Sequence, residues 1–135
     1  MVGYPHGRYL SIVFSLLQTR STGYVHITSA NDIYAPPEFD AGLLSDPLDV
    51  PPQRWAYKRG REIQRRMPAY RGEWAPSHPV FPEGSKAAVT SYNPHLNPAQ
   101  LKDYKYTAED DAAIDEWIRR ETVSMCHPMY VSSVS

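Results

Sequence analysis

The pattern of apolar and polar positions predicts two amphipathic helices, the first over residues 51–67. Pro51 and Pro52 suit its first turn, where a missing N–H costs nothing, and Pro68 ends it. One face carries apolar or small residues spaced by four, three and four, namely Ala56, Gly60, Ile63 and Met67. The other face is basic, with Arg54, Lys58, Arg59, Arg61, Arg65 and Arg66. Such a narrow apolar stripe predicts a helix that needs a sheet to lie on.

The second helix is predicted over residues 108–120. Thr107, with Asp110 three residues on, forms a capping box at its start. The first turn is acidic and the last turn basic, which suits the helix dipole: Glu109, Asp110 and Asp111 against Arg119 and Arg120. The expected buried stripe comprises Ile114, Trp117 and Ile118.

Strand patterns precede the first helix. Residues 9–17 are apolar and rich in β-branched and aromatic types, which favours a strand. Residues 19–23 form a turn with a glycine, and residues 24–28 then alternate, with Val25 and Ile27 on one face. Residues 9–28 are therefore predicted to form a β-hairpin.

The predicted fold class follows from these elements. We expect an α+β fold in which a mostly antiparallel sheet, begun by the hairpin, is covered by the helices at 51–67 and 108–120. Residues 86–92 are a further short candidate strand. The connections at 29–49 and 69–85 are long and rich in Pro, Gly, Asn and Asp, and loops of this length are usually functional or belong to a larger assembly.

Composition narrows the class of protein. The 135 residues suit one domain or part of a larger one, and a hydrophobic content of 41% is enough for a core. The formal net charge of -1 gives no general attraction to nucleic acid or to an anionic membrane. The single cysteine, Cys126, rules out an internal disulfide.

The sequence assigns no compartment. No stretch is long and apolar enough to span a bilayer, so no membrane association is predicted. Residues 1–8 lack the order of a signal peptide and are expected to be a loose segment. The final residues match no reliable targeting tripeptide.

The histidines offer no metal site. His6, His26, His78 and His95 share no ligand spacing, and we expect all four at the surface. His127, taken alone, is an ordinary solvated histidine. Its neighbour Cys126 suggests a thiolate nucleophile, but adjacent residues of a strand point to opposite sides and no third orienting group is visible.

The basic face of the 51–67 helix has two interpretations. It could bind phosphate or nucleic acid, or it could be solvated or covered by another domain or subunit. Glu62, Asp46 and Asp49 lie nearby in the sequence and the chain is slightly acidic, so the second interpretation is favoured and no nucleic acid is expected. The acidic run at 109–111 is explained by helix-end electrostatics.

The stretch Gly23-Tyr24-Val25-His26-Ile27-Thr28-Ser29 is followed by a second distinctive stretch at residues 35–49. Both show a resemblance to the glucose–methanol–choline (GMC) flavin oxidoreductases, and a closer one to their methanol (alcohol) oxidase branch. The resemblance is carried further by Trp55-Ala56-Tyr57-Lys58 and by residues 61–63, 65–67, 70–73, 81–87, 106–111 and 117–119. It covers residues 9–129, which implies a partial C-terminal substrate-binding domain followed by a divergent tail at 130–135. No Gly-x-Gly-x-x-Gly occurs, so the FAD-binding Rossmann part is absent and the cofactor-binding residues are unknown.

The resemblance also implies an activity. Family members oxidise a small primary alcohol to the aldehyde on FAD, with O2 as acceptor and H2O2 as product. Spacing from Trp117 places His127 on the family's catalytic acid/base histidine, with Cys126 where tryptophan is common. From Tyr130 the match fails, which suggests a truncated or mis-spliced end, or a fragment. We expect the isolated chain to be inactive, because the flavin domain and a second catalytic partner are missing.

Two rival functions remain. The first is a non-catalytic remnant that serves as an interaction or structural module. The second is a nucleic-acid binder that uses the basic helix. For the complete enzyme the expected partners are a small alcohol and O2, and the resemblance leaves a homo-oligomer open.

Overall fold

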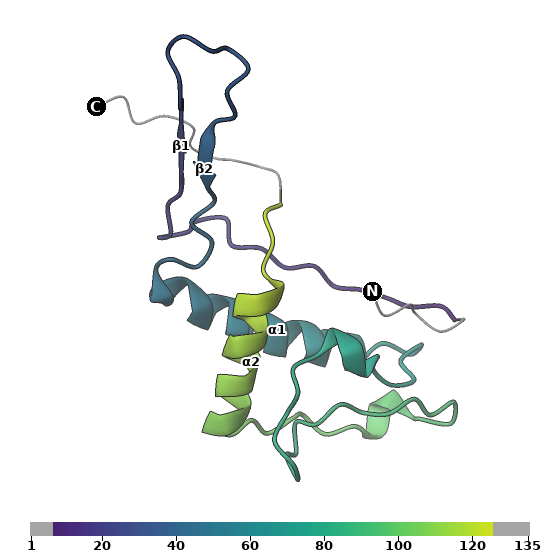
Figure 1. Cartoon of the computed structure of the whole chain (residues 1–135). Helices are drawn as coiled ribbons and strands as arrows, with labels where there is room; N and C mark the ends of the chain where they lie inside the picture. The colour runs from purple at the N-terminus through teal and green to yellow at the C-terminus, as the bar shows by residue number, and fades with distance from the viewer. Residues whose placement is uncertain (1–6, 126–135) are drawn as a thin grey trace.

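The computed structural model describes residues 7–125, which contain two α-helices and one two-stranded antiparallel sheet (Figure 1). In chain order the main elements are β1 (Tyr24–His26), β2 (Glu38–Asp40), α1 (Val50–Arg65) and α2 (Ala108–Glu121). Three short 3-10 turns join them: η1 (Pro47–Asp49), η2 (Ala75–Ser77) and η3 (Pro98–Gln100). The α+β class and the antiparallel pairing are therefore confirmed.

Helix α1 forms where the sequence predicts it, and Gly60 of the predicted stripe is buried, but the rest of the buried face differs. Ile63, which was expected in the stripe, is 47% exposed. The side chains turned inward are Tyr57, Arg61 and Arg65, spaced by four residues along one face. Arg61 and Arg65 are only 2% and 5% exposed, so the prediction of a solvated basic face is wrong for both. Both guanidiniums find acceptors inside, which makes their burial tolerable.

Helix α2 follows the prediction closely. The capping box is present, with Thr107 Oγ1 accepting from the Asp110 N–H and the Asp110 carboxylate accepting from the Thr107 N–H. Ile114 and Ile118 are buried and form the core with Tyr57 of α1. The partly buried hydrophobic residues around this core are Phe14, Leu44, Phe81, Tyr106 and Trp117.

The hairpin pairs different strands from those predicted. β1 pairs with β2, in the register that sets Val25 opposite Phe39, and not with residues 9–17. Gly42, with a φ of 58°, closes the base of this hairpin, where an added Cβ would lie 2.1 Å from the carbonyl oxygen of Thr22. This close approach favours pairing toward β2 and leaves residues 9–17 extended but unpaired among the described residues.

The helices do not cover the sheet. Figure 1 shows the β1–β2 hairpin projecting away from both helices, and every residue of both strands is exposed. The expectation of a sheet under helices is therefore wrong for these residues. The physical reason is that the inward face of α1 packs on α2 and on the loops that follow α1.

The long loops are pinned by backbone pairing around α1. The Glu73 N–H donates to the Thr90 carbonyl oxygen at 2.8 Å, and the Asn93 N–H donates to that of Arg71 at 2.7 Å. The predicted strand at 86–92 is therefore not a regular strand, although its end makes these two ladder-like bonds. Within residues 7–125 no helix is long and apolar enough to cross a bilayer.

Candidate functional site

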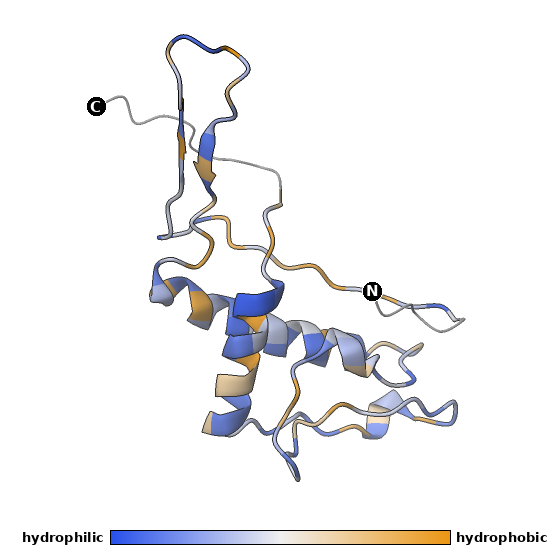
Figure 2. Cartoon of the chain, in the orientation of Figure 1, coloured by the Kyte–Doolittle hydropathy of each residue, from blue (hydrophilic) through white to orange (hydrophobic). Residues whose placement is uncertain are grey.

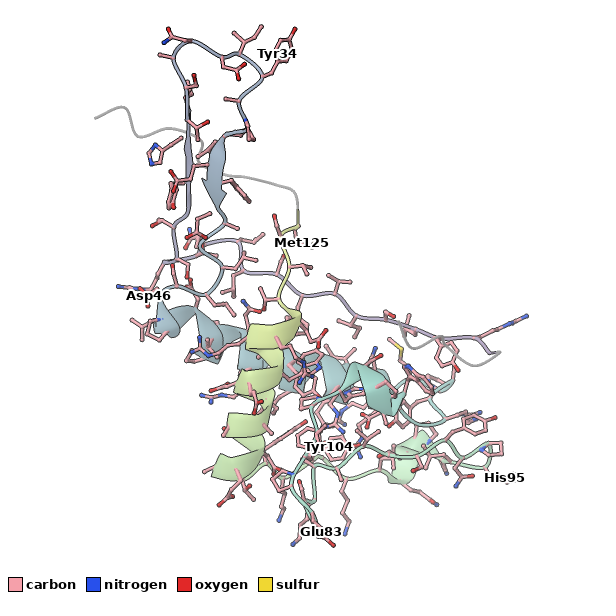
Figure 3. The ribbon with its side chains drawn as sticks, in the orientation of Figure 1. Tyr34, Asp46, Glu83, His95, Tyr104 and Met125 are labelled. Atoms are coloured by element: carbon pink, nitrogen blue, oxygen red, sulfur yellow. The ribbon has the colours of Figure 1, made fainter. Side chains whose placement is uncertain are left out.

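The predicted catalytic residue His127 and its neighbour Cys126 lie outside the described residues. The structure does describe the approach to them. The Thr122 N–H bonds the Ile118 carbonyl oxygen at 2.9 Å and closes α2, and the chain then continues to Met125. Figure 3 shows Met125 beyond the C-terminal end of α2, on the side of the β1–β2 hairpin.

Helix α2 is held firmly against α1. Arg54 Nη1 donates to Asp115 Oδ2 at 2.8 Å, and Lys58 forms an ion pair with Asp111. These contacts flank the apolar core at Ile114, so both polar and apolar interactions fix the helix. The segment that leads to residue 127 therefore leaves the body from a fixed point.

The most organised polar site is a buried ion pair between Arg61 of α1 and Glu73 of the following loop. Arg61 Nε donates to Oε1 and Nη2 donates to Oε2, both at 2.8 Å. The two side chains are 1% and 4% exposed. Such parallel, bidentate bonds are the strongest form of carboxylate–guanidinium pairing.

The remaining polar atoms of this pair are also satisfied. Arg61 Nη1 donates to the Ala87 carbonyl oxygen at 2.9 Å. Glu73 Oε2 accepts from the Thr90 N–H at 2.9 Å and from the Tyr104 hydroxyl at 3.1 Å. A buried pair stabilises a fold only when its other lone pairs and protons are bonded in this way.

Aromatic rings enclose the two buried arginines. The Arg61 guanidinium carbon lies 4.0 Å from the ring centroid of Tyr104, and that of Arg65 lies 3.5 Å from the same centroid. Figure 3 shows Tyr104 below α1. Cation–π contacts of this kind favour a weakly hydrated guanidinium inside the protein.

The pKa values in the cluster point to a structural role. Burial raises the pKa of Glu73, but the hydrogen bond and charge of Arg61 outweigh it, so the pKa lies below its ordinary value. Burial raises the pKa of Tyr106 to about 12 and that of Tyr57 further. A carboxylate held by a permanent partner and tyrosines that stay protonated do not exchange protons near neutral pH.

His78 corrects another sequence expectation. His26 and His95 are exposed, as predicted, and His6 lies outside the described residues. His78 is half-buried instead, with its Nδ1 2.9 Å from the Tyr57 hydroxyl. Burial lowers the pKa of His78, so the neutral imidazole is the form that the fold accommodates.

One hollow lies among the described residues, on the outer side of α2. This hollow of about 150 Å³ lies beside Trp117, lined also by Val80, Ala113, Glu116 and Arg120. Ligand pockets are usually about 300–1,000 Å³, so this one is too small for a flavin. In residues 7–125 no group of three or more His, Cys, Asp or Glu side chains is arranged to hold a metal ion.

Comparison with known proteins gives the family. The family model described as GMC oxidoreductase, for the C-terminal part, matches residues 19–133. The chain therefore belongs to the GMC oxidoreductase family.

The chain is similar to alcohol oxidases of three organisms. Alcohol oxidase 1 of Komagataella phaffii is 32% identical over 171 residues, which cover 96% of this chain and 25% of the relative. Alcohol oxidase of Pichia angusta is 32% identical over 168 residues, covering 97% and 25%, and that of Candida boidinii is 28% identical over 170, also covering 97% and 25%. The chain thus spans about a quarter of the length of these relatives. The matched regions exceed its 135 residues, so the relatives carry additional residues within them.

Proposed function

We propose that this chain is part of the substrate domain of an FAD-dependent alcohol oxidase. The complete enzyme oxidises a small primary alcohol to the aldehyde, with O2 as acceptor and H2O2 as product. The observation that carries the proposal is the GMC oxidoreductase match over residues 19–133, together with relatives whose names state alcohol oxidase. The matched range includes position 127.

His127 is the residue to which we assign the proton step. A histidine suits the removal of the substrate hydroxyl proton, because its unperturbed pKa of about 6.5 lies near working pH. The packing of α2 on α1 supports this role, since it fixes the base of the segment that carries the residue. In the complete enzyme the alkoxide is held by His127 and a second partner.

The flavin must be bound mainly by protein outside this chain. FAD would supply the acceptor for the two electrons of the substrate, and the hollow beside Trp117 is too small to hold it. The sequence contains no Gly-x-Gly-x-x-Gly to hold a dinucleotide. We therefore expect the purified chain with added FAD to show no bound-flavin absorbance and no alcohol oxidation.

A transplant tests the role of His127. Residues 107–129 would replace the matching segment of Komagataella phaffii alcohol oxidase 1, since α2 carries its own cap and apolar stripe. We expect this chimera to retain flavin absorbance and to form H2O2 from methanol. His127→Ala in the chimera should lower kcat at least a hundredfold, the usual range for losing a general base being about 10²–10⁴.

The matched control is Arg119→Gln, an exposed residue of the same transplanted helix, which should leave kcat within about twofold. The flavin absorbance of each variant separates loss of chemistry from loss of folding. A chimera that binds flavin but is inactive with His127 in place, or whose His127→Ala variant keeps its rate, would contradict the assignment and favour a non-catalytic remnant.

A further inference from the structure

Residues 10–17 have the side-chain pattern of a β-strand. Ile12, Phe14 and Leu16 are partly buried, whereas Val13 and Leu17, at the alternate positions, are 73% and 82% exposed. This alternation with a period of two is the signature of a strand with one covered face. The covered face lies on the body of the protein, because Phe14 packs against the core of α1 and α2.

The backbone of this segment has no sheet to join. Among the described residues, no backbone–backbone hydrogen bond involves residues 10–17, and one side chain reaches the segment, Gln64 Nε2 donating to the Leu10 carbonyl oxygen at 3.3 Å. An extended segment with free N–H and C=O groups is a template for another strand.

The sequence of the segment lacks the features that protect a free edge. Natural edge strands carry lysine, proline, inward charges or bulges that prevent pairing. Residues 9–19 contain no charged residue and no proline. Figure 2 shows this stretch as largely hydrophobic along its run from the N-terminal end to the base of the hairpin. Its composition is therefore that of a strand inside a sheet.

The segment is also held in place. Where it ends, the N–H groups of Arg20 and Ser21 donate to the buried Asp49 carboxylate at 2.9 and 2.8 Å. Asp49 lies directly before α1, so the end of the segment is tied to the body of the protein. A segment fixed in extended form loses little further conformational entropy when it pairs.

We propose that residues 10–17 form an edge strand that pairs, through its backbone, with a β-strand of the oxidase polypeptide that this chain does not span. This inference rests on the proposed function. The match with Komagataella phaffii alcohol oxidase 1 covers 96% of this chain, which leaves only a handful of residues outside it, so residues 10–17 fall within the match. That relative is about four times as long as the matched part, so its remaining length offers the polypeptide from which we infer that the pairing strand comes.

The β1–β2 hairpin points to the same missing layer. Val25 and Phe39 face each other across the hairpin and are 57% and 68% exposed, which gives it an uncovered apolar face. Two strands of three residues each are below the size that is stable alone in water. Both features are accounted for when a further part of a sheet covers this side of the chain.

Co-expression tests the pairing. The tagged 135-residue chain is produced together with Komagataella phaffii alcohol oxidase 1 from which the matched quarter is deleted, and the co-purified amount of the latter is measured. Ser15→Pro removes a backbone donor from the segment, and Val13→Lys places a charge on its exposed side. Each should lower the co-purified amount at least tenfold, while Val80→Lys, a change at a side chain that is 87% exposed elsewhere, should leave it within twofold.

Hydrogen exchange on the isolated chain tests two other pairing partners for residues 10–17: another segment of this chain, and a second copy of it. The amides of residues 11–17 should exchange freely in the monomer, and Ser15→Pro should leave its melting temperature unchanged, because the lost donor has no partner among the described residues. Protection of these amides in the monomer, or only on dimerisation, would assign the partner strand to this chain or to a second copy and overturn the proposal. Equal co-purification of Ser15→Pro and the unmodified chain, or none with either, would also overturn it. The His127 transplant still tests the proposed function independently.

Discussion

The two halves of this chain are built in opposite ways. The second half, from α1 onward, encloses a core of Tyr57, Ile114 and Ile118 and a buried ion pair. In the first half, no residue between 7 and 41 is buried. The difference shows that a segment can have an ordered backbone without enclosing a buried core.

The first half is ordered mainly by polar contacts. Asp49 receives the N–H groups of Arg20 and Ser21, and the Ser21 hydroxyl also bonds Asp49. Tyr24 bonds Glu38 across the hairpin at 3.0 Å. Such bonds set direction but bury little apolar area, so this half contributes less to the free energy of folding than the second.

The largest effect should come from breaking the buried ion pair. Glu73→Gln leaves the Arg61 guanidinium buried without a counter-charge, which typically costs about 3–5 kcal/mol. Urea unfolding of the purified chain measures this loss. The matched control is Glu121→Gln. The side chains of Glu121 and its partner Arg120 are 51% and 60% exposed, so this change should cost less than about 1 kcal/mol of stability. Equal effects of the two changes would contradict the view that the buried ion pair supports the interior of the second half more than an exposed pair does.

A pair of identical truncations compares the two halves directly. Ile114→Ala opens a cavity at a side chain that is 0% exposed and should cost about 2–5 kcal/mol. Ile33→Ala, in the loop between β1 and β2, removes the same atoms from a side chain that is 89% exposed and should change stability by less than about 0.5 kcal/mol. Thermal or urea unfolding of both variants gives the comparison. A large cost at Ile33 would mean that the first half has a core after all.

The sequence predicted the helices better than it predicted what they bury. Helix periodicity and the Thr107 cap are local signals, and both helices formed near their predicted bounds. The burial of Arg61 depends on Glu73, the Ala87 carbonyl and Tyr104, which approach only when the loops fold back. A rule that places basic residues at the surface fails where such partners converge. The one local hint was the spacing of Tyr57, Arg61 and Arg65 by four.

The strands failed for a related reason. The alternation in residues 9–17 is real, as the partial burial of Ile12, Phe14 and Leu16 shows, but a strand also needs a partner. Pairing is decided by the approach of distant backbone, which no local pattern contains. The assignment of His127 stays a prediction, because this residue lies outside the described residues. The domain bounds at 9–129 and 130–135 also stay predictions.

A smaller effect is expected at the start of α2. Thr107→Ala removes the acceptor for the Asp110 N–H and should cost about 1 kcal/mol of stability. Thr107→Ser keeps a hydroxyl there and is the matched control, with a cost of a few tenths of a kcal/mol at most. Urea unfolding distinguishes the two. If both variants lost the same stability, the methyl group and not the cap would be the important part of the side chain.

The smallest effect concerns pH and the half-burial of His78. Because its pKa in the folded state is lowered below 6.5, the unfolded chain binds the proton more readily, and stability should fall as the pH drops through 6.5. The pKa of Glu73 is lowered from 4.5 too, so its contribution is lost only at more acid pH. His78→Gln should therefore flatten the profile of stability against pH between about pH 6.5 and 5, measured by urea unfolding. The fall in stability at more acid pH should remain. His95→Gln, at an exposed histidine, should leave the profile unchanged. A profile that keeps its full slope in His78→Gln would show that the His78 imidazole is protonated as readily in the folded state as in the unfolded state. His78 would then not count as part of the buried interior that distinguishes the second half.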